Sequence, residues 1–598
     1  MIGDDRMEES LPLTEQTAGR DTVAAFLCRV LDALLREDHL GILTRGAPSD
    51  APADHLPHAM WWRAPLPGGR MAYLPVRPDG FLADHAVATA HLVVADARGA
   101  VHIESTVDGV LAALAPREDA QAEAGWAAFT DECRQTLEVL RLHDTVGPRL
   151  HARLASRDHT GFTGLLHHEA LAALRDHPVH PTGRCRWGMT PDELRSYAPE
   201  YLPSFPLRWV VVPRERMRLS EALAGGLPEW WPAPSELGQP AWADRDHLVV
   251  PVHPLTVEGG EISVVEVPGP LVVPTLSTRT VALATDPGVH LKLPLPTATL
   301  GQRNRRTIKP GTLVGGESVH RLLAAVRDRE PGLAAQVLLA DESRWADSDN
   351  DLLAVLVRQY PHQVANDTLV PVAALLAPDP DRPGARVIDG LATRHTGGDV
   401  LAWFDTYLSA LLDWHLALWL RYGIALEAHQ QNITLAHAPT GRSWLRLIYK
   451  DNDSARIDCA RASAALGQRV RPEDFPDRRI AISDPAELAD LVTTITLHLC
   501  VAALIVEETG PDRRRRAELF ALARTRLEEA AARWCDPTDP GSRAAATLLR
   551  TRLLDADRLP VKAMVTAGTL LPKERLGCTD VNKYYLRTGP NYLKAATA

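Results

Sequence analysis

The middle of this 598-residue chain consists of short runs of β-forming residues that proline and glycine interrupt, and this pattern limits the fold more than any other feature. Between positions 177 and 296 such runs are too short and too often broken for long helices. The last third instead carries apolar residues at helical spacing over 401–422, 488–507 and 516–534. The pattern predicts an α+β protein with a β-rich middle and a largely helical C-terminal part.

The first 150 residues predict a mixed unit of their own. Apolar positions over 22–35 have helical spacing, short strand-like runs follow, and a second helical tract covers 119–142. Domain boundaries are expected near positions 150 and 395. They divide the chain into three predicted domains, 1–150, 151–395 and 396–598.

Composition argues against several classes of protein. The net charge of −11 and the pI near 6.1 are unlike those of a nucleic-acid binder, which is usually basic. The seven cysteines are scattered and form no CxxC pair, which argues against a thiolate metal site. The polar N-terminus is no signal peptide, and apolar runs fall short of the roughly 18 residues of a membrane span. We therefore expect a cytoplasmic protein that binds neither nucleic acid nor membranes.

The first candidate segment, residues 177–188, reads HPVHPTGRCRWG. Each His-Pro step favours extended backbone, because the residue before proline avoids the α region. If the segment is a strand, Arg184 and Arg186 lie on the same side of it. Guanidinium groups there could bind carboxylates or phosphates. A structural loop with surface arginines is the alternative.

A predicted hairpin covers residues 274–296, with a turn signal at 285–288. Centring the turn at Pro287, or just before it, places Lys292 opposite residue 281. Ser277, Arg279 and Lys292 then share one face, and apolar residues share the other. Two cations and a hydroxyl group on one face predict a cradle for a polyphosphate. An ordinary solvated hairpin face is the alternative.

A basic cluster follows this hairpin directly. Arg303, Arg305, Arg306 and Lys309 lie within seven positions of an otherwise acidic chain. A solvated basic turn is the alternative, but the position of the cluster next to the predicted cradle favours anion binding.

A second predicted hairpin joins strands at 433–437 and 444–449 through a Pro-Thr-Gly turn. Folding it back places Asn432 opposite a residue at 448–450, so His429, Gln431 and Asn432 meet Lys450, Asp451 and Asp453 at one end. Carboxylate and amide oxygens suit Mg²⁺, and histidine and lysine can bind phosphate oxygens. The pattern predicts a magnesium–nucleotide site. A polar hairpin end with a satisfied histidine is the alternative.

In this order, the segments resemble the motifs of the IucA/IucC family, the NRPS-independent siderophore synthetases. The family pattern HPxHPxxKxRxG is similar to 177–188, with Arg184 where lysine is usual, and the Ser-x-Arg-Thr strand is similar to 277–280. The next strand carries Lys292. The Thr-x-x-x-Arg element is similar to Thr299 and Arg303, with Arg305 and Arg306 as rivals for the arginine.

The C-terminal motifs resemble the same family. EAHxQN is matched in full by residues 427–432, and the Arg-Asp pair of the next strand is similar to Lys450-Asp451, with the base exchanged. The resemblance runs from about residue 150 to the C-terminus. It implies a multi-domain architecture like a cupped hand, with thumb, fingers and palm, and a homodimer.

The resemblance also implies a ligase that uses ATP and Mg²⁺. Such an enzyme adenylates a carboxylic acid, citrate or a related di- or tricarboxylate, releases pyrophosphate, and condenses the acid with an amine, hydroxylamine or alcohol. The implied catalytic residues are His429, Gln431, Arg303 and Thr299. The implied nucleotide- and acid-binding residues are His177, His180, Arg184, Arg186, Ser277, Thr278, Arg279, Lys292 and Lys450, and the implied metal ligands are Glu427, Asn432 and Asp451.

Two alternatives remain open from the sequence. HxxN, followed about twenty residues later by an aspartate after a hairpin, is also typical of kinase-like small-molecule phosphotransferases. No N-terminal Gly-rich loop with a strand lysine accompanies it, since the first lysine is Lys292. The last third also resembles an iron-reductase-like region, which would suit binding of a ferric chelate. Cys535 and Cys578 alone do not support an iron–sulfur centre.

Overall fold

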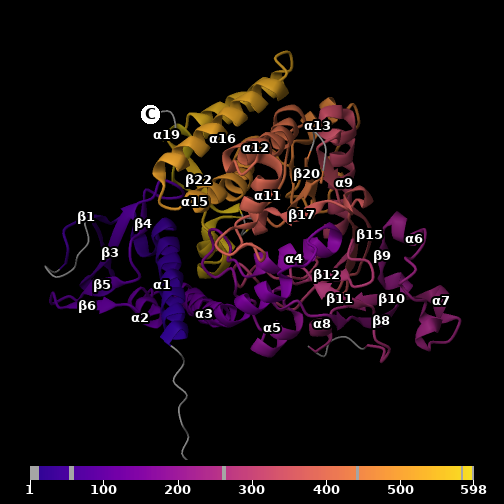
Figure 1. The fold of residues 1–598 in the computed structure, drawn as a ribbon, viewed down its shortest axis with the longest axis horizontal. Coiled ribbons are helices and arrows are strands. Elements are labelled where there is room, and N and C mark those ends of the chain that lie inside the picture. Colours follow the sequence, from indigo (N-terminus) through magenta and orange to yellow (C-terminus); the bar gives the residue numbers. More distant parts are fainter. Residues whose placement is uncertain are drawn as a thin grey trace, which may run out of the picture.

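The computed structural model describes residues 13–52, 60–258, 264–439, 444–578, 580 and 583–595. Its N-terminal part lies to the left in Figure 1, its middle part at the lower right and its C-terminal part at the top. The mixture of helices and twisted sheets confirms the predicted α+β class.

The N-terminal part packs helices against one face of a six-stranded antiparallel sheet, in the order β1-β2-β3-β5-β6 with β4 beside β3. Its core joins apolar residues of the first helix to the sheet, and it also includes Val565 and Leu570 from the far end of the chain. The predicted helix at 22–35 and the helical tract at 119–142 are confirmed within longer helices. The elements are α1 (Leu13–Arg36), β1 (Ala47–Ser49), β2 (Trp61–Leu66), β3 (Arg70–Pro78), β4 (His85–Val87), β5 (Leu92–Ala95), β6 (Val101–Glu104), α2 (Val107–Ala113) and α3 (Ala120–Leu154).

The middle part is centred on a seven-stranded sheet, in the order β7-β11-β12-β13-β16-β15-β9, with the pair β8–β10 packed beside it. This confirms the β-rich middle. Its elements are α4 (Gly161–Ala173), α5 (Pro191–Tyr197), β7 (Phe205–Pro206), β8 (Arg208–Pro213), β9 (Arg218–Leu219), α6 (Glu221–Ala224), α7 (Ala243–Asp246), β10 (His247–Val252), α8 (Pro254–Glu258), β11 (Leu271–Pro274), β12 (Thr280–Leu283), β13 (Val289–Lys292), α9 (Thr312–Arg329), α10 (Pro331–Ala334), β15 (Asp341–Asp347) and β16 (Val355–Gln359).

The C-terminal part packs helices around a four-stranded sheet, in the order β14-β20-β19-β17. Strands from both sides of the expected boundary at 395 share this sheet, since β14 and β17 precede that position. Its elements are β14 (Val337–Leu339), β17 (Thr368–Pro371), α11 (Val387–Thr396), α12 (Val400–Leu416), β18 (Ile424–Ala425), β19 (Ile433–His437), β20 (Leu445–Tyr449), β21 (Arg456–Ile457), α13 (Cys459–Leu466), α14 (Ala486–Leu491), α15 (Ala503–Thr509), α16 (Arg513–Trp534), α17 (Pro540–Leu549), β22 (Arg558–Lys562), α18 (Lys573–Leu576), β23 (Tyr585–Pro590) and α19 (Tyr592–Ala595).

One continuous helix within the described residues, Ala486–Thr509, is long and apolar enough to span a membrane by length and composition. The expectation that no segment approaches this length was therefore wrong, because uncharged threonines extend the apolar stretch without adding charge. The protein itself covers this helix, since 89% of its apolar window is buried. It forms part of the C-terminal core.

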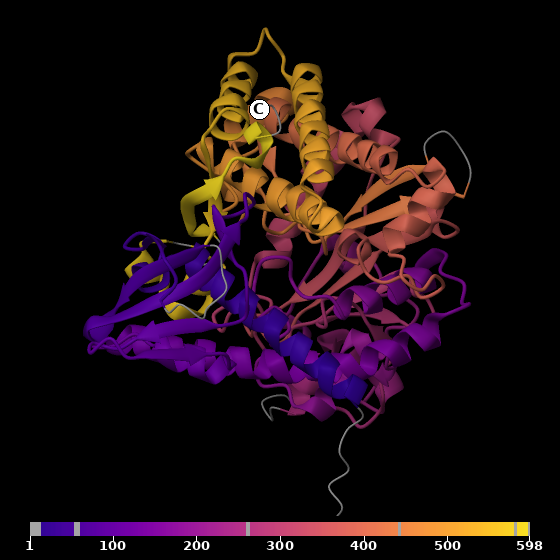
Figure 2. The ribbon, with the colours of Figure 1, turned by 60° about the vertical axis from the view of Figure 1, so that its left-hand side comes forward.

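Glu132, in the middle of α3, ties the three parts together. Helix α3 extends from the N-terminal sheet toward the middle part (Figure 2). The Glu132 carboxylate accepts hydrogen bonds from Thr182 Oγ1 (3.0 Å), Trp187 Nε1 (3.2 Å), Gln302 N (2.9 Å) and Thr569 Oγ1 (2.6 Å). Burial raises the pKa of Glu132, and these donors oppose that effect. One buried side chain thus satisfies donors from both other parts of the chain.

We expect Glu132→Ala to lower the free energy of unfolding by about 3 kcal/mol, because four donors lose their acceptor and the hydroxyls of Thr182 and Thr569 are fully buried. Thermal unfolding measures this as a lower midpoint. Glu138→Ala, at an exposed position of the same helix, is the control and should leave the midpoint unchanged. Equal midpoints for both variants would show that Glu132 does not hold the parts together.

Candidate functional site

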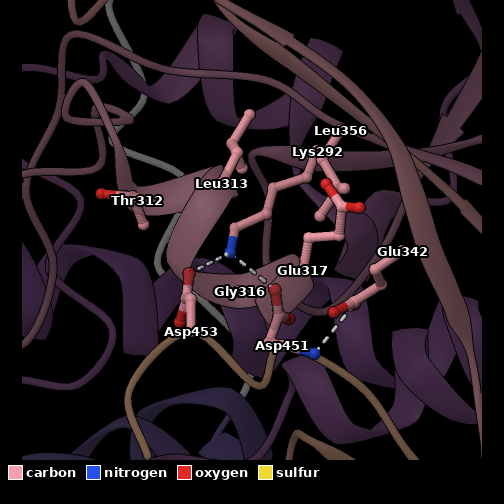
Figure 3. Close-up of a pocket in the computed structure, with 9 residues that line it drawn as sticks. All are labelled: Lys292, Thr312, Leu313, Gly316, Glu317, Glu342, Leu356, Asp451 and Asp453. Atoms are coloured by element: carbon pink, nitrogen blue, oxygen red, sulfur yellow. Dashed lines mark hydrogen bonds and ion pairs between the residues drawn. The ribbon is translucent and has the colours of Figure 1, made fainter. Parts of the chain in front are cut away.

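The ammonium group of Lys292 lies between two carboxylates where the middle and C-terminal parts meet. It donates to Asp451 Oδ1 at 2.6 Å and to Asp453 Oδ2 at 3.1 Å (Figure 3). Asp451 Oδ1 also lies 2.6 Å from Arg358 Nη2. Glu342 accepts both the Asp451 backbone N–H (2.9 Å) and Arg358 Nε (2.6 Å). Strands β13, β15 and β16 thereby fix the segment that follows β20.

The start of helix α9 forms the opposite wall of this pocket. Thr312, Leu313, Gly316 and Glu317 line it together with the charged cluster around Lys292 (Figure 3). A Cβ at Gly316 would lie 3.3 Å from Asp453 Cβ. Glycine therefore allows the helix to approach the aspartate closely.

Asp451 combines a carboxylate that its neighbours keep ionised with a left-handed backbone. Burial alone would raise its pKa, but Arg358 and Lys292 outweigh burial and hold the pKa well below the ordinary value. The backbone at Asp451 is left-handed, with φ of 56°. Such conformations cost about 1 kcal/mol or more in residues other than glycine, and they are frequent at functional sites. The ion pairs hold this carboxylate in place and ionised.

The register of the first hairpin differs by one residue from the prediction. Lys292 pairs with Thr280, not with residue 281. Arg279 nevertheless lies close enough to Asp451 for that carboxylate to act on its pKa, which burial lowers. Thr278 has φ of 65°, so the chain turns before β12 and strand alternation does not fix the direction of Arg279. The predicted register was wrong, whereas the proximity of the two cations to one site is observed.

The second hairpin has the predicted register. The Lys450 N–H donates to the carbonyl of Asn432 at 3.2 Å, and Ile433 pairs with Tyr449. Its Pro-Thr-Gly turn lies largely outside the described residues. The Lys450 ammonium group donates to the buried Glu169 of α4 at 3.1 Å, so in this structure it is paired within the protein. This contact holds α4 against the end of β20.

His429 lies at the end of this hairpin as a neutral side chain. Burial lowers its pKa to about 4, and the nearby Glu427 only partly opposes this. Its Nδ1 accepts the Gln431 N–H at 3.3 Å. His177 lies near enough for the two imidazoles to affect each other's charge, and its own pKa is well below the ordinary value, chiefly through burial.

Glu427 is held by lysines from the end of the chain. Lys583 Nζ lies 2.9 Å from one carboxylate oxygen and Lys562 Nζ lies 3.2 Å from the other. Although burial raises the pKa of Glu427, these two cations lower it further than burial raises it. The pKa of Lys583 falls to about 8, mainly because the ammonium is buried.

The arginine that points to the site is Arg306, not Arg303. Arg303 is exposed, whereas Arg306 donates through Nε to Thr299 Oγ1. Burial lowers the pKa of Arg306 to about 9; neighbouring Arg279 lowers it as well, and Asp451 raises it. Residues 298–305 form a tight turn that the Ala298–Arg305 bridge closes. Extended backbone at the bridge directs the adjacent Arg305 and Arg306 to opposite sides. Of the three arginines that the sequence left open, Arg306 thus lies near Asp451, whereas Arg303 is exposed; which arginine binds the substrate stays a prediction.

Residues 177–188 are irregular turns rather than a strand, so the prediction that Arg184 and Arg186 share a strand face was wrong. Arg186 forms a bidentate pair with buried Glu200, at 2.7 and 3.0 Å. Arg184 donates to the carbonyl of Ala173 and lies 3.7 Å from Asp176. Both guanidinium groups are used to fold the loop.

Two histidines of this loop stabilise its backbone. His177 Nδ1 accepts the N–H of Val179 (3.1 Å) and of His180 (2.8 Å), and His180 Nδ1 accepts the N–H of Thr182 (3.2 Å). Burial lowers the pKa of His180 to about 3. Ser277 lies in the turn before β12 and accepts a long hydrogen bond from Thr280 Oγ1 (3.4 Å).

Helix α1 helps to hold the loop that carries His177 and His180, which no feature of the sequence indicated. Arg29 of α1 donates to the carbonyls of His177 (2.6 Å) and His180 (2.8 Å), and Arg36 donates to Val179 O (3.2 Å). No motif marks these arginines in the sequence. Arg358 was also missed, although a charged residue inside the apolar strand VLVRQ was a signal that could have found it.

The predicted metal ligands do not form one group. Glu427 is occupied by two lysines, and the Asn432 amide donates to the Glu427 carbonyl at 3.5 Å. Within the described ranges, no three His, Cys, Asp or Glu side chains are placed to hold a metal. Asp451 and Asp453 do converge on one cation, the Lys292 ammonium, and their oxygens have the chemistry that Mg²⁺ prefers.

Comparison with known proteins identifies the class. Residues 165–377 match the model of the IucA/IucC family, and residues 401–575 match that of the ferric iron reductase FhuF-like transporters. The chain is 28% identical over 346 residues to staphyloferrin B synthase of Staphylococcus aureus, which covers 52% of this chain and 58% of that protein. It is 27% identical over 287 residues to the L-2,3-diaminopropanoate–citrate ligase of the same organism, with coverage of 43% and 48%. It thus spans about half the length of the curated relatives it matches.

Solved structures agree on the fold. The petrobactin biosynthesis protein AsbB of Bacillus anthracis superposes with a TM-score of 0.75 at 15% identity, covering 98% of this chain and 99% of AsbB. The ATP-bound aerobactin synthetase IucA of Klebsiella pneumoniae superposes with a TM-score of 0.69 at 17% identity, with coverage of 95% and 99%. The fold is therefore that of the NRPS-independent siderophore synthetases. Residues 165–377 form a region of the IucA/IucC family.

We expect Lys292→Met to lower the free energy of unfolding by about 3 kcal/mol near pH 7, because two partly buried carboxylates lose a buried cation. The pKa of Asp451 is depressed in the folded state, so its pairing stabilises the protein above the unfolded-state value of about 3.9. That contribution is lost as the pH falls further. The difference between wild type and variant should therefore persist from pH 7.5 down to about pH 4 and shrink below pH 4.

Denaturant unfolding at pH 7.5, about pH 4 and about pH 3, on both sides of the unfolded-state pKa, measures this difference. Lys309→Met, at an exposed lysine, is the control and should show no loss at any pH. A loss that stays constant with pH would assign the Lys292 contribution to packing rather than to charge.

Proposed function

We propose that this chain is an ATP-dependent ligase of siderophore biosynthesis. It adenylates a carboxylic acid, citrate or a related di- or tricarboxylate, and joins it to an amine, hydroxylamine or alcohol as an amide or ester. The observation that carries the proposal is the convergence of Lys292, Arg279 and Arg306 on the buried Asp451, with neutral His429 beside them.

The charge arrangement suits this reaction. Adenylation brings a carboxylate anion to a polyphosphate, and fixed cations offset their repulsion and stabilise charge that develops in the transition state. Lys292 and Arg279 would contact the phosphates. Arg358 is not available for this, because it is fully buried between Glu342 and Asp451. Its role is to keep Asp451 ionised.

Arg306 would bind the acid. Thr299 accepts its Nε–H, which directs the remaining guanidinium N–H groups. A guanidinium group can bind a carboxylate through two parallel hydrogen bonds. With its pKa lowered to about 9 by burial and by Arg279, Arg306 is still charged at neutral pH.

His429 would act as a clamp on the reacting groups. With a pKa of about 4 it is neutral at physiological pH, so it orients by hydrogen bonding and adds no positive charge. Gln431 is tied to it through its backbone N–H. An acyl adenylate is already reactive, so an amine that attacks its carbonyl carbon and displaces AMP needs little help from a base.

Asp451 and Asp453 would hold Mg²⁺ together with the nucleotide, once Lys292 moves from between them to the phosphates. The ion would supply positive charge at the phosphate oxygens. The names of similar proteins support the proposal: one is a citrate ligase, another a staphyloferrin B synthase, and the IucA structure is described as ATP-bound. A homodimer remains a prediction.

We expect the protein to release pyrophosphate and AMP from ATP only when its acid is present, and to catalyse acid-dependent exchange between pyrophosphate and ATP. Product analysis by mass spectrometry with a panel of acids and amines measures both half-reactions. Asp451→Asn should abolish them. Acid-dependent formation of ADP would instead support the kinase-like phosphotransferase and contradict the proposal.

A matched pair of variants tests whether Arg306 or Arg303 binds the acid. We expect Arg306→Ala to lower the exchange rate by about 100-fold, as removal of one transition-state donor does in other enzymes, and Arg303→Ala to have little effect. Exchange rates measured at varied acid concentration compare the two variants. Thermal unfolding verifies that both variants are folded. A larger loss in Arg303→Ala would restore the assignment made from the sequence.

A further inference from the structure

A second pocket opens to solvent between the end of α3, the start of α4, the segment after residue 201 and strand β11. Its cavity volume is about 170 Å³, below the range of about 300–1,000 Å³ of sites for drug-sized molecules, so its ligand must be small. None of its lining residues lines the Lys292 pocket. It is therefore a separate cavity.

One rim of this pocket is cationic. Arg153 and Arg157 are four positions apart, and Arg157 Nε donates to the Arg153 carbonyl at 2.5 Å, which fixes the two side chains on one side of the turn that ends α3. Arg153 donates to the carbonyls of Tyr201 and Leu202. Within the described part of the chain, neither guanidinium group forms an ion pair with a carboxylate, and no acidic residue lines the pocket.

Two carboxylates that contact the segment after α3, those of Asp158 and Asp381, have other partners. Asp158 accepts hydrogen bonds from the N–H and the hydroxyl of Thr160. Asp381 accepts the Ser156 N–H and lies 3.7 Å from His159. The positive charge at the rim is therefore left for a ligand.

The floor of the pocket is apolar. Leu154 and Leu166 are almost fully buried and face it, and Val273 of β11 contributes further apolar surface. His167 at the side is neutral, because burial and neighbouring His159 and Arg157 lower its pKa to about 4. A neutral imidazole adds a hydrogen-bonding group to the pocket without adding to the positive charge of the two arginines.

We propose that this pocket binds a small organic acid that has one carboxylate and an apolar arm. The carboxylate lies between Arg153 and Arg157, and the arm lies on Leu154 and Leu166. Guanidinium groups bind carboxylates in a planar, directional manner, and the apolar floor selects against compact, fully hydrated anions such as phosphate and citrate. The site is distinct from the one proposed to bind ATP and the reacting acid.

The test is calorimetric titration of the full-length protein with hexanoate and benzoate. Hexanamide and benzamide have the same shape without the charge, while acetate and formate carry the charge without an apolar arm. We expect hexanoate and benzoate to bind, and every comparison compound to bind more weakly by about tenfold or more, as loss of a charged hydrogen bond or of apolar contact implies. Acetate binding as tight as hexanoate binding would overturn the proposal.

Variants locate the site. Arg157→Gln should weaken binding of hexanoate by about tenfold or more, whereas Arg149→Gln, at an exposed position of α3 outside the pocket, should leave it unchanged. Ser204→Phe keeps both arginines and fills the pocket, so it should also prevent binding. Thermal unfolding verifies that each variant is folded. Unchanged affinity in a folded Arg157→Gln or Ser204→Phe protein would overturn the proposal, and both results are independent of ATP turnover.

Discussion

The site depends on a buried ion cluster in which Lys292 and Arg358 hold Asp451. Burying a carboxylate is costly unless cations and hydrogen-bond donors compensate. Here the compensation comes from β13 and β16, while Glu342 of β15 accepts the Asp451 N–H. The cluster therefore joins the seven-stranded sheet to the end of β20 and fixes the left-handed backbone of Asp451. Each charge in it has a structural partner as well as a place in the proposed chemistry.

The same principle connects the rest of the molecule. Glu132 gathers donors from three distant segments, and Arg29 holds the carbonyls of the loop that carries His177. Glu427 is held by Lys562 and Lys583, so the end of the chain reaches the site. The N-terminal part, which shows no motif in the sequence, thus positions residues of the middle part. Hydrogen bonds to backbone groups provide this positioning, and such contacts require no particular sequence pattern at the acceptor.

Sequence reasoning succeeded where local periodicity or a short turn controls the structure. The hairpin around Asn432 and Lys450 has the predicted register, because its strands are adjacent and joined by a short turn. It failed by one residue at Lys292, because the turn of that hairpin is centred at Asp286, slightly earlier than the sequence indicated. It also could not decide between Arg303, Arg305 and Arg306, since spacing alone cannot show which side of a tight turn faces the site. In both cases one residue of backbone geometry decides the direction of a side chain.

The sequence by itself determined the α+β class, the order of the motifs and the residue types of the site, because each depends on local patterning and on chemistry. Only the tertiary structure decided which groups are free to bind a ligand. Arg184, Arg186 and Lys450 match family positions, yet each is used in an internal ion pair or hydrogen bond. Arg358 and Glu342 matter because strands far apart in the chain meet at Asp451. Whether a charged side chain binds a ligand or another part of the protein depends on what lies next to it in space, and sequence spacing does not contain that information.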